Sequence, residues 1–134
     1  MHWGGAVPRI VLVTGGRAYR DQATVIRALD HMRERGMECV LQGGASGADR
    51  WARIYANVRV MACMTVDAPW DAMRTKAGPI RNGWMMRFGR PDACVHFPGG
   101  KGTENMLALC SKAGILTLDG SEIGRPGKGT TVMT

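Results

Sequence analysis

Three short apolar runs in this chain each end in a pair of glycines, and each pair is followed by a helix-like segment. The pairs are Gly15-Gly16, Gly43-Gly44 and Gly99-Gly100. The runs before them are continuously apolar, which is typical of strands buried on both faces of a parallel sheet. Strands that alternate with helices favour such a sheet. The sequence therefore predicts a single Rossmann-like, doubly wound α/β domain with a mostly parallel sheet of about five strands.

The expected strands span residues 9–14, 38–42, 60–66, 93–97 and 115–118, and the expected helices include 21–35, 79–88 and 103–112. Ser46 is the predicted N-cap of a further helix, with Asp49 three residues later in a capping-box position. Trp70 and Asp71 are expected in a loop. We expect the folded domain to cover residues 9–119, with a loose N-terminus at 1–8 and a flexible tail at 120–134.

The charge and composition limit the partners of the chain. Its 134 residues fit one domain, and a net charge of +7 suits an anionic partner such as a nucleotide, a nucleic acid or a phosphate ester. We expect no membrane span and no signal peptide, hence a cytoplasmic protein. The four cysteines form no Cys-x-x-Cys pair and the three histidines do not cluster, so we expect free thiols, a reducing compartment, no metal and no cofactor.

The glycine turns are the predicted binding site. In a parallel sheet the carboxyl ends of the strands lie at one edge, so the three turns should converge there. Glycine lets the backbone approach a ligand, and free amides at a helix start bind phosphate. The densest cluster runs from Phe97 to Glu104; there Thr103 can cap a helix or contact a phosphate, and Lys101 adds charge or is simply solvated. Neither the P-loop pattern nor the dinucleotide fingerprint is present.

Side chains near these turns complete the prediction. Arg81, and after it Arg17, can place a guanidinium on a phosphate. Trp70 can stack on a base or act as a packed lid, while Asp71 can bind a sugar hydroxyl. The predicted ligand-binding residues are Thr14, Gly15, Gly16, Arg17, Gly43, Gly44, Ser46, Gly47, Asp49, Trp70, Asp71, Arg81, Asn82, Pro98, Gly99, Gly100, Lys101, Gly102, Thr103 and Glu104.

Four segments together resemble the SLOG superfamily, and within it the YspA-like group. The segments are Val13-Thr14-Gly15-Gly16-Arg17, Gln42-Gly43-Gly44-Ala45-Ser46-Gly47-Ala48-Asp49, Ala77-Gly78-Pro79-Ile80-Arg81-Asn82 with Met85, and Phe97-Pro98-Gly99-Gly100-Lys101-Gly102-Thr103. The resemblance implies a Rossmann-like fold that binds a nucleotide-derived ligand. It also implies a homodimer, for which helix faces bearing Met85, Met86, Met106 and Leu109 are available.

The superfamily also includes phosphoribohydrolases, and these enzymes suggest catalytic residues. They carry an arginine four residues before a methionine, as Arg81 and Met85 stand here. Their glutamate position, three residues after the threonine of the glycine run, is Met106 in this chain. Arg81 and Glu104 are the predicted catalytic pair, although Glu104 also suits a helix cap. Three hypotheses remain: a binding or sensing domain, a nucleotide N-glycosidase, and a single-stranded DNA binder.

Overall fold

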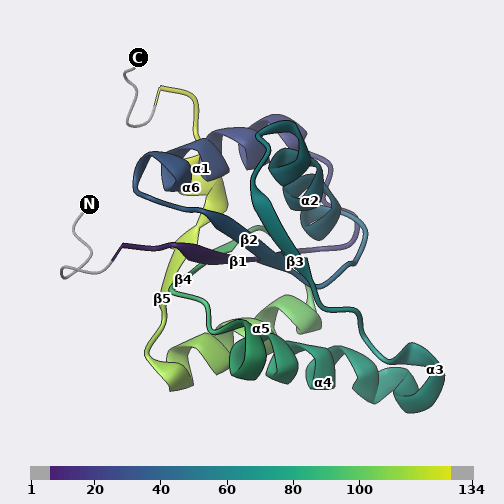
Figure 1. The fold of residues 1–134 in the computed structure, drawn as a ribbon. Coiled ribbons are helices and arrows are strands. Elements are labelled where there is room, and N and C mark those ends of the chain that lie inside the picture. Colours follow the sequence, from purple (N-terminus) through teal and green to yellow (C-terminus); the bar gives the residue numbers. More distant parts are fainter. Residues whose placement is uncertain (1–6, 128–134) are drawn as a thin grey trace.

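The computed structural model describes residues 7–127, in which five strands form one parallel sheet (Figure 1). The strands lie side by side in the order β3-β2-β1-β4-β5, and every neighbouring pair is parallel. Their bounds are β1 Ile10–Thr14, β2 Cys39–Gln42, β3 Ala62–Thr65, β4 Ala93–His96 and β5 Leu116–Asp119. The predicted α/β class and parallel five-stranded sheet are confirmed.

The order of the strands creates a switch in direction beside β1. The chain moves outward from β1 to β2 and β3, and then returns to place β4 on the other side of β1. The connections that leave β1 and β4 therefore diverge at the carboxyl edge of the sheet. In open α/β sheets a crevice forms at this point, and ligands bind there.

Helices cover both faces of the sheet (Figure 1). One face carries α1, α2 and α6, while α4 and α5 cover the other and α3 extends beyond the sheet edge. The helices are α1 Gln22–Glu34, α2 Ala48–Val58, α3 Trp70–Met73, α4 Ala77–Trp84, α5 Lys101–Ala113 and α6 Gly120–Ile123. A 3-10 turn, Arg74–Lys76, joins α3 to α4, and a π-helical turn, Met85–Gly89, continues α4.

The side chains of β1 alternate between two cores. Val11 and Val13 belong to the cluster formed with α1, α2 and α6. Leu12 points to the opposite face, where it packs in the cluster that contains Met85 and Met106. All three β1 side chains are fully buried. A strand with both faces covered needs apolar residues at consecutive positions, which explains the continuous apolar run.

The predicted cap of α2 is wrong. The N-cap residue is Gly47, which has a φ of +76° and provides no side chain for capping. The Ser46 hydroxyl instead donates a hydrogen bond of 3.0 Å to the carbonyl oxygen of Arg17. The left-handed backbone at Gly47 separates Ser46 from the helix start, so the hydroxyl joins two turns. Asp49 does not form a capping box either, because its carboxylate accepts amides from the preceding turn.

The segment after β3 is more helical than predicted. Trp70 and Asp71 lie in α3 and not in a loop. The next helix begins at Ala77, two residues before the expected start at Pro79. Proline fits here because the amides of a first helical turn have no partner within the helix, so its missing N–H costs nothing.

Part of the predicted flexible tail is folded. Helix α6 follows β5 directly, and Ile123 is buried in the core beside α1. The Arg27 Nε atom donates a hydrogen bond of 2.5 Å to the carbonyl oxygen of Gly124. At the other end Pro8 is buried, although it was expected in the loose N-terminus. Residues 1–6 and 128–134 lie outside the described range.

Within the described range, no helix combines the length and the apolar character needed to cross a membrane. The same residues contain no cluster of three His, Cys, Asp or Glu side chains that could hold a metal ion. All four cysteines are free thiols: Cys94 and Cys110 are buried, and Cys39 and Cys63 are partly buried.

Candidate functional site

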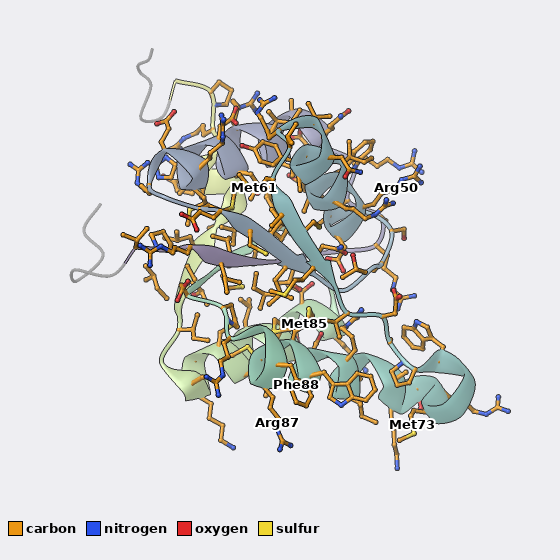
Figure 2. The ribbon with its side chains drawn as sticks, viewed as in Figure 1. Arg50, Met61, Met73, Met85, Arg87 and Phe88 are labelled. Atoms are coloured by element: carbon orange, nitrogen blue, oxygen red, sulfur yellow. The ribbon has the colours of Figure 1, made fainter. Side chains whose placement is uncertain are left out.

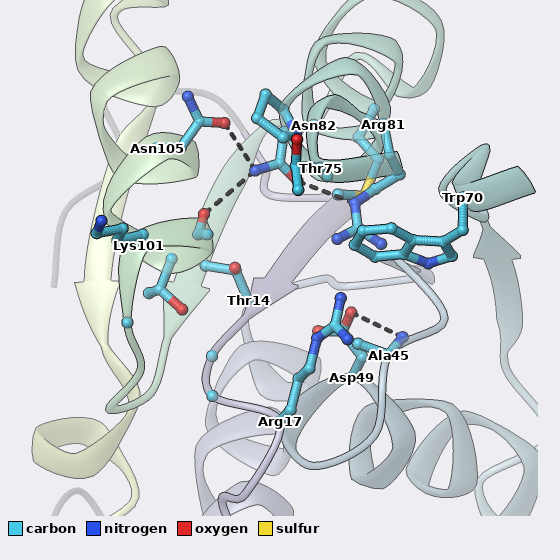
Figure 3. A pocket seen from close by; sticks show the side chains of 18 residues that line it. Thr14, Arg17, Ala45, Asp49, Trp70, Thr75, Arg81, Asn82, Lys101 and Asn105 are labelled. Carbon is cyan, nitrogen blue, oxygen red and sulfur yellow. Dashed lines mark hydrogen bonds between the residues drawn. The ribbon is translucent and has the colours of Figure 1, made fainter. Parts of the chain in front are cut away.

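A cavity of about 480 Å³ opens at the carboxyl edge of the sheet, at the switch between β1 and β4 (Figure 3). It is lined by the turn after β1, the turn after β2, α4 and the start of α5, with Trp70 at one side. The lining residues are Thr14, Gly15, Gly16, Arg17, Ala45, Asp49, Trp70, Thr75, Gly78, Pro79, Arg81, Asn82, Met85, Gly100, Lys101, Gly102, Thr103 and Asn105. Twelve of these were predicted as ligand-binding residues from the sequence.

Glycine is required after β1 because neighbouring segments approach closely. A Cβ on Gly15 would lie 2.6 Å from the Cβ of Ala48. The Gly16 amide donates a hydrogen bond of 2.8 Å to the carbonyl oxygen of Pro98, and a Cβ there would lie 2.8 Å from the same oxygen. Gly99 in turn packs against the Gly16 amide nitrogen. The turns after β1 and β4 are thus fastened together beneath the cavity.

The turn after β2 is organised by Asp49. Its Oδ2 atom accepts hydrogen bonds from the amides of Gly43 (3.1 Å) and Ala45 (3.3 Å). Burial raises the pKa of this carboxyl to about 6, although those hydrogen bonds and the nearby Arg81 and Arg17 oppose the rise. Asp49 therefore holds the turn in shape, and Oδ2 is already occupied by backbone groups.

Arg81 is a buried cation in the cavity wall. Its Nε atom donates to Asn82 Oδ1 at 3.0 Å, and its Nη1 atom donates to the Gly43 carbonyl oxygen. The other terminal nitrogen, Nη2, has no hydrogen-bond partner in the described part of the chain. Burial lowers the pKa of the guanidinium, which still remains protonated at neutral pH. The site thus contains a fixed positive charge with one donor group available.

Asn82 connects α4 to the start of α5 (Figure 3). Its Nδ2 atom donates to the carbonyl oxygen of Gly102 at 3.2 Å and to Asn105 Oδ1 at 2.9 Å. Asn105 and Thr75 line the cavity but were not predicted from the sequence. The apolar spacing of Met106 and Cys110 marks the buried face of α5 and could have indicated that Asn105 lies on the adjoining face.

The start of α5 is open to the cavity. No described atom lies within 4 Å of the position that a Cβ would occupy on Gly100 or Gly102. Gly100 is the N-cap, and no side chain of the described residues caps it. The first amides of a helix have no partner within it and carry partial positive charge. Lys101 is exposed beside them, and Thr103 is buried with its hydroxyl against Gly99.

Arg17 and Trp70 face each other across the mouth of the cavity (Figure 3). The Arg17 guanidinium carbon lies 4.8 Å from the centroid of the Trp70 ring, within the range of a cation–π contact. Trp70 is 45% exposed, so much of its ring surface is accessible.

Two further hollows adjoin the main cavity and contain four of the remaining predicted residues, Gly43, Gly44, Ser46 and Gly47. One, of about 350 Å³, is lined by Gly43, Gly44, Ser46 and Asp67 together with residues that also line the main cavity. Ser46 and Gly47 lie in the other hollow, of about 610 Å³.

Other predicted residues are not brought to the cavity. Glu104 is exposed and does not line it, and Pro98 and Gly99 lie behind the lining, where they contact Gly16. The Asp71 side chain lies outside the described part of the structure. Met106, at the position of the phosphoribohydrolase glutamate, is fully buried in the core.

Comparisons with known proteins give three similarities. The model of the YspA, cpYpsA-related SLOG family matches residues 9–72. The gene 61 protein of Mycobacterium phage D29 is 38% identical over 117 residues, which cover 80% of this chain and 92% of that protein. The X-ray structure of DNA processing protein A from Streptococcus pneumoniae aligns with 15% identity and a TM-score of 0.46, over 90% of this chain and 62% of that one.

Proposed function

Because this chain belongs to the YspA, cpYpsA-related SLOG family, we propose that it binds a nucleotide or a nucleotide-derived phosphorylated small molecule as a sensor or sequestering domain. The observation that carries this proposal is the open start of α5, which lines the same cavity as the buried Arg81. Uncapped amides and a fixed guanidinium are the groups that bind phosphate in proteins.

The phosphate group would lie at the start of α5. There the amides that follow Gly100 carry partial positive charge, and Lys101 adds a full charge nearby. Arg81 Nη2 supplies a donor from α4. A base attached to this phosphate would lie against the Trp70 ring after displacing the Arg17 guanidinium, because aromatic rings stack on bases with little dependence on sequence.

The position of the carboxylates favours binding over hydrolysis. Cleavage of an N-glycosidic bond needs a placed carboxylate. Met106 is buried in the core at the position where the related hydrolases have glutamate, and Glu104 is outside the cavity. Among the described lining residues, Asp49 is the one carboxylate, and it accepts two backbone amides. We therefore favour a ligand that is bound unchanged over the N-glycosidase hypothesis.

The homodimer implied by the family remains a prediction. Met85 and Met106 cannot supply its interface, because both are buried in the core. Trp84 and Phe88 are 39% and 70% exposed near α4, and Phe88 points away from the sheet (Figure 2). An interface on this helix would use these two rings, and light scattering of wild type and Phe88→Asp tests it.

The test of nucleotide binding is a panel of AMP, NAD, ADP-ribose and cyclic dinucleotides, with thermal shift and product formation measured together. The Arg81→Ala variant removes the buried cation, and Arg53→Ala removes an exposed one on α2 as a matched control. We expect one ligand to raise the melting temperature by several degrees in wild type and in Arg53→Ala. In Arg81→Ala we expect a loss of affinity of about a hundredfold.

Release of free base in wild type would instead support the N-glycosidase hypothesis. If no nucleotide shifts the melting temperature, the small-molecule proposal is wrong. Binding of a labelled single-stranded oligonucleotide that weakens steeply with salt would then support the nucleic-acid hypothesis, which the net charge of +7 also suits.

A further inference from the structure

The 350 Å³ hollow beside the main cavity contains an exposed carboxylate that does not line the main cavity. The main cavity contains Lys101, Arg81 and the start of α5, all of which favour an anion. The hollow contains Asp67, a carboxylate that comes two residues after the end of β3. Arg17 and Arg81 line both spaces, so Asp67 adds a negative charge beside two cations.

The two spaces adjoin each other, because Arg17, Ala45, Trp70 and Arg81 line both of them. Volumes of 480 and 350 Å³ fall in the range of small-molecule sites. A ligand with its phosphate at the start of α5 and its base against Trp70 would extend past Arg81, with its sugar facing Asp67.

Asp67 lies close to the turn after β2, and its carboxylate is free to accept hydrogen bonds. Its Oδ1 atom lies directly against Gly44, where a Cβ would collide with it and where φ is +75°. No hydrogen bond or ion pair to Asp67 is found within residues 7–127, and the residue is exposed. Asp49 differs, because it is buried and accepts two backbone amides. Asp67 is therefore the carboxylate at this edge that can receive hydrogen bonds from a ligand.

We propose that Asp67 accepts hydrogen bonds from the ribose hydroxyls of the ligand, so that the site selects a ribonucleotide over its deoxy counterpart. This inference rests on the proposed nucleotide binding. A carboxylate accepts hydrogen bonds and repels phosphate, so the part of the ligand beside Asp67 must be a hydrogen-bond donor and not the phosphate. In a nucleotide the sugar is attached directly to the phosphate, and its hydroxyls are the donors nearest to that group.

The experiment compares AMP, 2′-deoxy-AMP and 3′-deoxy-AMP by titration calorimetry. We expect the wild type to bind AMP at least about tenfold more tightly than one of the deoxy forms, because a hydrogen bond to a charged group is lost. In Asp67→Ala this ratio should fall to about twofold or less. Affinity for the deoxy form should not fall in this variant, since a charge that repels the phosphate is removed.

Glu34→Ala is the matched control, because it removes an exposed carboxylate at the C-terminal end of α1 that lines neither the main cavity nor the hollow. It should keep the wild-type ratio. Equal affinity of the wild type for all three nucleotides would overturn the ribose inference and leave nucleotide binding intact. An unchanged ratio in Asp67→Ala would also overturn it. If no nucleotide binds the wild type, the proposed function is wrong and this inference is wrong with it.

Discussion

The glycine turns at the carboxyl edge of the sheet look alike in sequence but differ in space. In the turns after β1 and β2, the space beside Gly15 and Gly43 is filled by Ala48 and Arg81. At the start of α5, the space beside Gly100 and Gly102 is empty of described atoms. We call the first pair the packed turns and the second the open turn. Glycine is thus required by packing in one place and permits access in the other.

This difference separates stability from binding. A side chain added in the packed turns must displace the neighbouring protein atoms, so its cost appears in folding. A side chain added in the open turn displaces no atom of residues 7–127. It instead occupies the space where a ligand would lie. Substitutions in the two regions should therefore have opposite consequences, and the following predictions test that contrast from the largest effect to the smallest.

The largest effect on the unfolding free energy is expected from Asp49, which orders the packed turn after β2. Its pKa is raised from an ordinary value of 3.8 to about 6, so between these values the folded state binds more protons than the unfolded state. Stability due to this group therefore falls as pH rises through that window. Relative to Asp49→Asn, the wild type should lose about 3 kcal/mol of unfolding free energy from pH 4 to pH 7.

Urea unfolding of both proteins at pH 4, 5, 6 and 7 measures this difference. The amide variant keeps an acceptor for the Gly43 and Ala45 amides but cannot ionise. If the unfolding free energies of the two proteins differ by the same amount at every pH, the pKa of the Asp49 carboxyl is not raised.

The next effect is expected for Gly15→Ala in the packed turn after β1. The new Cβ would lie 2.6 Å from the Cβ of Ala48 and 3.0 Å from that of Phe97, so these segments must separate. We expect a loss of about 2 kcal/mol of unfolding free energy. The urea midpoint should fall while the m-value stays constant. Wild-type stability in this variant would contradict the packing explanation.

The smallest effect on folding is expected for Gly102→Ala in the open turn. Gly102 lies in the first turn of α5, and alanine should stabilise the fold by about 0.5 kcal/mol because it reduces the freedom of the unfolded chain. The added methyl group would still occupy space beside the helix amides, so nucleotide affinity should fall about tenfold. Full affinity together with higher stability would remove the distinction between the two kinds of turn.

The sequence predicted the strands well because both faces of the sheet are buried. Val11, Leu12 and Val13 form a continuous apolar run because β1 packs against a core on each face of the sheet. The structure contains both cores. The convergence of the glycine turns followed from the same parallel arrangement. These features depend on local pattern and on a general rule of topology, so they can be inferred without coordinates.

The roles of single side chains were harder to predict because they depend on contacts between distant segments. Ser46 has the residue type of a cap, but its hydroxyl binds Arg17 in another turn. Asn105 reaches the cavity because α5 buries Met106, and that orientation is set by packing on the sheet. Asp67 comes two residues after a strand, near the sheet edge where ligands often bind, yet only the structure places it against Gly44.

The central position of β1 has a consequence for synthesis on the ribosome. This strand emerges before the other strands of the sheet, and one of its edges can pair with β2 soon afterwards. The other edge must wait for β4, since the hydrogen bond from the Ile10 amide to Asp92 joins residues 82 positions apart. An unpaired edge in the middle of an apolar sheet favours association between nascent chains. A nascent chain that stalls before Ala93 should therefore depend most on chaperones.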